Sequence, residues 1–407
     1  MKTVGLIVEY NPLHYGHVHH YTASKITTKA DCVIAVMSGH FLQRGEPAIV
    51  GKWARAEAAL RMGADVVLEL PVRYSTSPAE WFAYGAVSLL NATGVVDSLC
   101  FGSELGELKP LQSLADLLQH EPESFKQYLK LELKKGNSYP SAYSKAIQHI
   151  TQAEIDPAAK PNNNLGLHYL LALARTHSSI EPFTVPRIKA EFHQSDITDQ
   201  TIASATAIRG LIHNHSKLSA LQAYMPEYML HIIEQEFKAG RGPVSWESFT
   251  SPMLYQLQSH TAKTLADFDE VDEGLEHRIL RAMVQLKTEV FTIPKLMDAL
   301  KTKRYTKTKL QRMLLRILLQ QSKVSFTRDL LAEGPAYIRV LGFSEAGQAL
   351  LKQMKKKASL PVITTVERKH SALLEEELRA TAIYAMAYQD ATLWHMQRDY
   401  YQSPIRL

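Results

Sequence analysis

The hydrophobic pattern of the first hundred residues alternates between short apolar runs and longer amphipathic stretches. The apolar runs predict buried β-strands at residues 4–8, 32–37, 66–70 and 98–101. Between them, apolar side chains at helical spacing predict helices at residues 52–62 and 81–90. Strands that alternate with helices favour a Rossmann-like, doubly wound parallel sheet, whose right-handed crossovers bring the loops after the strands to one edge.

The pattern changes near residue 218. A last strand is predicted at 183–188, and beyond Leu218 the chain shows amphipathic helices, such as 218–237 and 277–286, with few strand signals. The stretch 240–243 is a candidate linker. Because 407 residues are too many for one ordinary core, we predict an α/β domain over residues 1–217 and a mainly α-helical domain over residues 218–407.

Composition places the chain among soluble globular proteins. Hydrophobic residues make up 45% of it and charged residues 21%, and no apolar run is long enough to span a membrane. The N-terminus lacks a signal-peptide pattern, because Lys2 is followed by a strand and then by polar histidines. Cys32 and Cys100 lie inside apolar runs, which excludes a disulfide framework and favours a reducing, cytoplasmic location.

The first predicted strand leads into a turn that holds two histidines, His14 and His17, at the start of a helix. An open parallel sheet places its ligand site at such a turn, where the N–H groups of a helix start are exposed. Gly16 between the histidines lets a ligand approach the backbone, so the turn suits a phosphate. Two alternatives remain: a helix start with incidental histidines, or a metal site, which the lack of a cysteine or carboxylate cluster within the helix disfavours.

Polar and glycine residues fill the loop after the second predicted strand. Gln43, Arg44 and Glu46 lie together there, and Lys52 and Arg55 follow at the next helix. These cations could bind phosphates or a carboxylate. The alternative is a set of turn glycines with solvated polar neighbours.

Two later helix starts carry polar residues that suit a nucleotide. Ser204, Thr206 and Arg209 offer hydroxyls and a guanidinium to an anion at a helix N-terminus. The run of Asn162, Asn163 and Asn164 opens another helix, where an asparagine could cap the backbone N–H groups or contact a ligand. Both segments could also be capped helix starts alone.

A basic segment, KTKRYTKTKLQRMLLR at residues 301–316, contains no acidic residue and carries Tyr305 among its cations. Its apolar stripe predicts a helix whose exposed side meets a phosphate backbone. A second basic run lies at residues 352–357, and together they suggest a nucleic-acid face. The alternative is an ordinary solvated helix face. The predicted RNA contacts are Lys301, Lys303, Arg304, Lys307, Lys309 and Arg312.

Two motifs resemble the nucleotidylyltransferase superfamily: H-x-G-H at residues 14–17 and the Ser204-x-Thr206-x-Ile-Arg209 segment near the end of the predicted α/β domain. The stretch MSGHFLQRGEPAIVGKWARAEAALRMGADVVLELP is similar, over its whole length, to the tRNA(Met) cytidine acetate ligase family. Tyr15 and His19 depart from the family pattern, where Asn and Tyr are usual, which puts fine substrate geometry in doubt.

The resemblance implies a two-step reaction: acetate and ATP form acetyl-adenylate, and the wobble cytidine of elongator tRNA(Met) then takes the acetyl group. The chemistry of the first step predicts magnesium on the leaving pyrophosphate, although no carboxylate pair in the sequence stands out as its ligand. No obligate protein partner is evident. Catalytic roles fall to His14, His17 and a cation, for which we choose Lys52. The implied ATP contacts are Ile7, Val8, Glu9, Tyr10, Asn11, Pro12, Gly16, His20, Gly102, Asn163, Arg187, Ile188, Ser204, Thr206 and Arg209.

Two other functions share parts of this pattern. A small-molecule adenylyltransferase would use the same α/β motifs but leaves the basic segment unexplained. A non-catalytic, ATP-sensing RNA-binding protein would keep the basic segment, but the intact histidine and Ser-Thr-Arg motifs speak against it.

Overall fold

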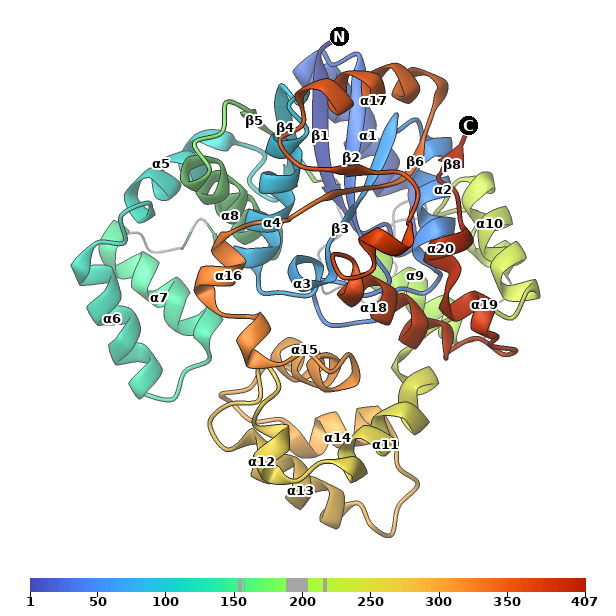
Figure 1. The fold of residues 1–407 in the computed structure, drawn as a ribbon. Helices are drawn as coiled ribbons and strands as arrows, with labels where there is room; N and C mark the ends of the chain where they lie inside the picture. Colours follow the sequence, from blue (N-terminus) through green and yellow to red (C-terminus); the bar gives the residue numbers. More distant parts are fainter. Residues whose placement is uncertain (153–155, 157, 188–203, 215–217) are drawn as a thin grey trace.

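The computed structural model describes residues 1–152, 156, 158–187, 204–214 and 218–407. One sheet organises the chain, with strand order β5-β4-β1-β2-β3-β6-β7 and β8 paired with β6 (Figure 1). Its first five strands are mutually parallel, which confirms the predicted parallel sheet. They are β1 (Thr3–Val8), β2 (Cys32–Ser38), β3 (Val66–Leu70), β4 (Ser98–Ser103) and β5 (Glu181–Pro186).

Helices cover both faces of this sheet, as a doubly wound fold requires. Alternate residues of β2 point to opposite faces: Ile34 and Val36 join one buried cluster, and Val33 and Ala35 the other. The first cluster includes α4 (Ala79–Ala92), α5 (Leu108–Leu118), α8 (Pro161–Arg175) and α17 (Glu345–Lys357). The second includes α1 (Tyr15–Thr28), α2 (Lys52–Met62), α9 (Ala205–His213) and α10 (Glu227–Lys238).

The predicted division at residue 217 needs a correction, because the C-terminal part of the chain returns to the sheet. β6 (Ile338–Phe343) pairs antiparallel with β3, and β7 (Val362–Ile363) and β8 (Ile405–Arg406) pair with β6. The strand signal of β6 was missed because a buried arginine, Arg339, interrupts its apolar run. Helices α16 (Arg328–Ala332), α18 (Glu375–Ala385), α19 (Leu393–Met396) and α20 (Arg398–Tyr401) flank these strands.

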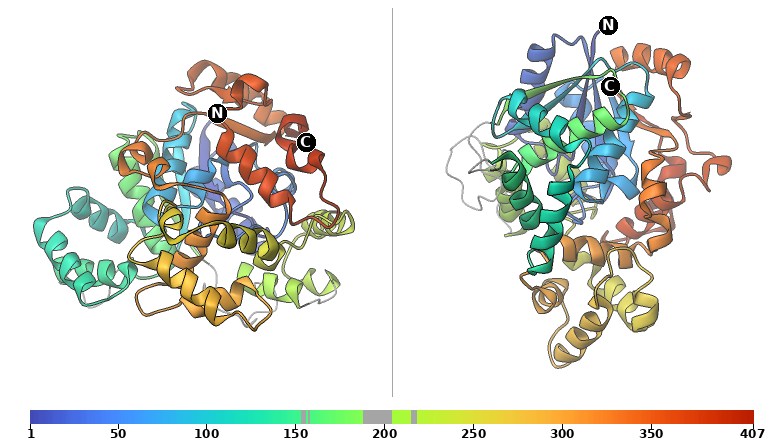
Figure 2. Two further views of the ribbon diagram at one scale, coloured as in Figure 1. Left: turned by 60° about the horizontal axis from the view of Figure 1, so that its bottom comes forward. Right: turned by 90° about the vertical axis from the view of Figure 1, so that its left-hand side faces the viewer.

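A smaller helical unit over residues 244–319 contributes most of a third buried cluster, which also includes Phe41, Val72 and side chains of residues 380–388. It projects from the sheet in Figure 1 and in the right-hand view of Figure 2, where it is yellow and orange. The predicted helix at 218–237 is in fact a short 3-10 turn at Leu218–Leu221 and then α10, because Pro226 starts a new helix. The unit contains α11 (Thr250–Ser259), α12 (Ala262–Leu265), α13 (Leu275–Gln285), α14 (Ile293–Leu300) and α15 (Lys307–Leu318).

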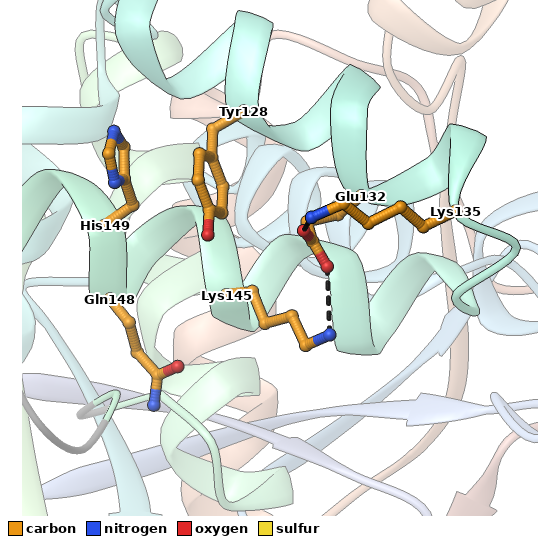
Figure 3. Close-up of a pocket in the computed structure, with 6 residues that line it drawn as sticks. All are labelled: Tyr128, Glu132, Lys135, Lys145, Gln148 and His149. Atoms are coloured by element: carbon orange, nitrogen blue, oxygen red, sulfur yellow. Dashed lines mark hydrogen bonds and ion pairs between the residues drawn. The ribbon is translucent and has the colours of Figure 1, made fainter.

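A helical arm, α6 (Glu123–Lys134) and α7 (Tyr139–Thr151), stands beside the sheet. Between its helices lies the hollow of Figure 3, where Glu132 accepts from Lys145 at 2.9 Å and Tyr128 stacks on His149 with ring centroids 4.1 Å apart. Because the buried Glu132 carboxylate is already paired with Lys135 and Lys145, we interpret this hollow as part of the contact between α6 and α7.

Two further observations bear on the composition. Cys32 and Cys100 are both free and buried, as predicted for small core residues. Within the described residues, no helix is long and apolar enough to cross a membrane.

Candidate active site

The two histidines lie where β1 gives way to α1, at the carboxyl edge of the sheet. His14 caps α1: its Nδ1 accepts the Gly16 N–H at 3.1 Å. His17 lies one turn later, and its Nδ1 accepts the His14 N–H at 3.3 Å. The two rings are 3.9 Å apart between centroids. This reciprocal capping box fixes both rings side by side and leaves each Nε2 without a partner among the described residues.

The environment keeps both rings neutral. Burial, with smaller contributions from the guanidinium groups of Arg187 and Arg209, lowers the pKa of His14 to about 3. Burial also lowers the pKa of His17 well below its ordinary value, with smaller contributions from His14 and Arg187. Since each Nδ1 accepts a backbone N–H, the single ring proton sits on Nε2. The site therefore presents two neutral N–H donors.

The turn before His14 is held by residues from distant parts of the chain. The side-chain oxygen of Asn11 accepts the Ile49 N–H at 2.8 Å, and its backbone carbonyl accepts from Arg209 Nη1 at 2.9 Å. Tyr10, which has a φ of 49°, packs edge-on against His17 with ring centroids 5.0 Å apart. The predicted residues Tyr10, Asn11, His17 and Arg209 are thus brought together.

Helix α9 starts as the Ser-Thr-Arg segment predicts. Ser204 is its N-cap and accepts the Ala207 N–H at 3.1 Å. Thr206 Oγ1 accepts from Arg209 Nη2 at 3.3 Å, and Arg209 reaches the turn after β1. The two motifs therefore meet through Arg209, although almost two hundred residues separate them in sequence.

A second side of the site is formed by β4, α1 and the end of β5. A Cβ built on Gly102 would lie 3.3 Å from Arg187 Cγ and 3.8 Å from His20 Cδ2, so these three predicted residues are neighbours. Burial, with a smaller contribution from Arg187, lowers the pKa of His20 to about 4. Ile188, predicted beside Arg187, lies outside the described residues.

Asn163 has a structural task at the start of α8. It is buried, and its side-chain oxygen accepts the N–H groups of Glu104 at 2.8 Å and Leu105 at 3.2 Å. In return, the Glu104 carboxylate accepts the N–H groups of Asn162 and Asn163. The helix is therefore capped by Glu104, and the predicted contact of Asn163 with adenosine stays a prediction.

Lys52 does not fit the catalytic role that we predicted. It is fully buried, and its Nζ lies 2.8 Å from carboxylate oxygens of both Glu69 and Asp399. Its charge is therefore matched twice inside the core. Sequence could not reveal this, because Asp399 is 347 residues away.

Arg55 is likewise a structural cation. It is buried and donates to the backbone carbonyls of Glu9 at 2.7 Å and Ser38 at 3.1 Å, and also to that of Gly39. It ties the ends of β1 and β2 together. Among the described cations, Arg187 and Arg209 lie close enough to His14 to lower its pKa.

The loop after β2 contacts the end of β1. Glu9 accepts the Gln43 N–H at 2.9 Å, and Gln43 Nε2 donates to the Ser77 carbonyl at 3.3 Å. Burial raises the pKa of Glu9, against the attraction of Arg44 and Arg209. This polar cluster borders the histidines.

The predicted RNA-binding segment is less positive than its sequence suggests. Residues 301–306 are loop, and α15 begins only at Lys307. An acidic stretch that we did not connect with it, residues 269–273, supplies partners: Glu270 holds Arg312 at 2.7 Å and Lys309 at 3.2 Å, and Glu273 holds Arg304. Exposed cations with no ion pair among the described residues remain at Lys301, Lys303 and Lys307.

Two further parts of the RNA prediction need correction. Arg316 is buried and donates to the hydroxyl of Thr76 at 2.7 Å, so it joins α15 to the sheet domain. The second basic run is the last part of α17, which lies at the opposite end of the sheet from α15 (Figure 1). The two basic runs therefore do not form one face.

Metal ligands are not gathered anywhere in the part of the chain that the structure describes. It holds no group of three or more His, Cys, Asp or Glu side chains that could bind an ion.

Known proteins resemble the whole chain. A family model described as HIGH Nucleotidyl Transferase matches residues 1–399. The tRNA(Met) cytidine acetate ligases of Caldanaerobacter subterraneus subsp. tengcongensis and Acetivibrio thermocellus are each 42% identical to it, with 100% of both chains covered. Crystal structures of Thermotoga maritima TmcAL match at 34% identity over 100% of both chains, with TM-scores of 0.90 bound with alpha-thio ATP and 0.91 in the apo form. The chain belongs to the tRNA(Met) cytidine acetate ligase family.

Proposed function

We propose that this protein is an ATP-dependent ligase that joins acetate to the N4 amine of the wobble cytidine of elongator tRNA(Met). The observation that carries the proposal is the pair of neutral histidines beside two arginines, in a chain 42% identical to ligases of that name. Its two free, buried cysteines fit a reducing cytoplasm.

In the first step, a carboxylate oxygen of acetate attacks the α-phosphorus of ATP, and the bond to the β-phosphate breaks to release pyrophosphate. Negative charge builds on the α-phosphate oxygens during this exchange. The Nε2–H groups of His14 and His17 donate to those oxygens, and Arg187 and Arg209 supply positive charge. Removing one preorganised donor of this kind raises the reaction barrier by about 2.7–4 kcal/mol.

In the second step, the N4 nitrogen of cytidine attacks the acetyl carbonyl, the bond from carbon to the AMP oxygen breaks, and the nitrogen loses a proton. The exposed cations Lys301, Lys303 and Lys307, with Arg304, hold the tRNA backbone for this transfer. Lys309 and Arg312 support them through their pairs with Glu270.

Magnesium stays a prediction. The described residues hold no group of three or more His, Cys, Asp or Glu side chains that could bind it, and neither step above is routed through a metal. The remaining predicted nucleotide contacts, from Ile7 and Val8 through Pro12 and Gly16, belong to this proposal as lining of the ATP site.

The proposal is tested by incubating the protein with ATP and radiolabelled acetate, with and without tRNA. We expect acetate-dependent exchange of pyrophosphate into ATP, and label in tRNA only when ATP is present. Exchange that needs no acetate would indicate an adenylyltransferase of another substrate. ATP and tRNA binding with neither exchange nor transfer would indicate a sensor.

A further inference from the structure

The loop between β2 and α2 lies between α15 and the histidine site. Its tip is a tight turn in which the Gly45 N–H donates to the Leu42 carbonyl at 2.8 Å, and Gly45 has a φ of 75°. A Cβ built on Gly45 would lie 2.5 Å from the backbone nitrogen of Arg312, so the turn rests directly on the backbone of α15. On the other side of the same loop, the Gln43 N–H reaches Glu9. A shift of α15 therefore presses on a loop that borders the site.

One side chain of this loop bridges the two regions. Glu46 Oε1 accepts from Gln311 Nε2 on α15 at 3.0 Å, while its Oε2 lies 3.6 Å from Arg209 Nη2. Gln311 is buried, which leaves its amide little choice of partner. Arg209 in turn donates to Thr206 and to the Asn11 carbonyl, three residues before His14. The contacts run without a gap from α15 to the predicted phosphate site.

We propose that Glu46 is a positioning residue that sets Arg209 according to the position of α15, and so couples tRNA binding to ATP binding. The proposal rests on the proposed function, since it takes α15 as part of the tRNA face. Glu46 and the ATP phosphates are anions that compete for the same guanidinium. While Gln311 holds Glu46 in place, the Glu46 carboxylate attracts the guanidinium of Arg209. When bound tRNA shifts α15, Glu46 is released from Gln311, and Arg209 becomes free to bind the phosphates of ATP.

The coupling must be reciprocal. If tRNA tightens ATP binding by a given factor, ATP tightens tRNA binding by the same factor. We expect a factor of about fivefold or more, the lower end of typical coupling between sites.

The first test measures the affinity for α,β-methylene-ATP, whose bridge cannot be cleaved, by titration calorimetry without tRNA. Glu46→Gln removes the competing charge, and Gln311→Met removes the donor on α15 at nearly constant volume. We expect both variants to bind the analogue several-fold more tightly, and the double variant to gain no more than Glu46→Gln alone. Thr308→Ala, which changes the same helix but keeps the hydrogen bond from Gln311 to Glu46, is the matched control and should bind like the wild type.

Additive effects in the double variant, or a Gln311→Met affinity equal to that of the wild type, would overturn the proposed coupling through Glu46. A second measurement adds a saturating elongator tRNA(Met) transcript. The wild type should then bind the analogue more tightly, while Glu46→Gln should show no further gain; an equal gain in both contradicts the proposal. Acetate-dependent pyrophosphate exchange, measured in parallel, reports on the proposed function alone. Failure of the ligase activity is therefore distinguishable from failure of the coupling through Glu46.

Discussion

The carboxyl edge of the sheet and helix α15 both carry arginines, but they neutralise them differently. Arg55 donates to backbone carbonyls, which are dipoles without net charge, and Arg209 donates to one such carbonyl and lies 3.6 Å from the Glu46 carboxylate. On α15, Arg312 lies against the carboxylate of Glu270. Carbonyls satisfy the hydrogen bonds of a guanidinium without cancelling its charge, and the charges of Arg187 and Arg209 add to burial in lowering the pKa of His14.

The paired cations of α15 have the opposite consequence. Each carboxylate from residues 269–273 removes a charge that the sequence alone would assign to RNA binding. The proposed RNA face therefore depends on a few unpaired lysines. The proposed ATP site depends instead on contacts between distant parts of the chain, such as those of Asn11 with Ile49 and Arg209. The predictions below separate these two regions.

The largest effect is expected in the core beneath the site. Lys52→Met leaves Glu69 and Asp399 buried without their shared cation, which should cost about 3–5 kcal/mol of stability. Urea unfolding followed by circular dichroism measures it, with Lys126→Met on the exposed side of α6 as control. Normal unfolding together with lost pyrophosphate exchange would instead restore Lys52 as a catalytic residue.

The next effect is catalytic. His17→Ala removes one neutral donor and should slow acetate-dependent pyrophosphate exchange by about 10²–10³-fold in kcat. The affinity for tRNA should stay unchanged, because the proposed RNA contacts lie at residues 301–307 and not on α1. His19→Ala, two residues along the same helix, is the control. Loss of tRNA affinity in His17→Ala would show that the two regions are not separate.

The third effect is a pH dependence of stability. The pKa of His14 is about 3 in the folded protein and near 6.5 when unfolded, so the unfolded chain takes up a proton first as pH falls. His14 thus costs no stability above pH 6.5 and about 1.4 kcal/mol for each unit below it, or roughly 2 kcal/mol at pH 5. His14→Asn, unfolded in urea at pH 8 and pH 5, should lose that much less on acidification than the wild type. An identical loss in both proteins would mean that His14 is protonated in the fold.

The smallest effect concerns the RNA face. Replacing Lys301, Lys303 and Lys307 together with alanine should lower the slope of log affinity against log salt by about 0.7–0.9 for each phosphate that the lysines neutralise in the wild type. Binding of α,β-methylene-ATP should not change. The matched control replaces Lys352, Lys355 and Lys356 on α17, at the other end of the sheet. A greater loss of tRNA affinity in that control would place the RNA face on α17.

Local patterns were sufficient to predict the sheet and the histidine turn. The strand over Val66–Leu70 and the helix over Lys52–Met62 have the predicted bounds, because apolar periodicity is a property of neighbouring residues. His14 and His17 could be predicted for the same reason, since their capping box closes within four residues.

What sequence could not predict is set by partners far apart in the chain. Asp399 forms an ion pair with Lys52, and Glu270 forms one with Arg312, yet neither acid lies near its cation in sequence. The return of β6 to the sheet is a contact of the same kind. The roles of charged residues are especially hard to predict from sequence, because one carboxylate distant in sequence converts a candidate ligand group into a structural ion pair.

The central claim, that the histidine site activates acetate for transfer to tRNA, is tested most directly on the product. Elongator tRNA(Met) incubated with the protein, ATP and acetate is digested to nucleosides and examined by mass spectrometry. We predict one acetyl group on the wobble cytidine, absent when acetate or ATP is omitted. An unmodified wobble cytidine, under conditions in which the protein binds both ATP and tRNA, would contradict it.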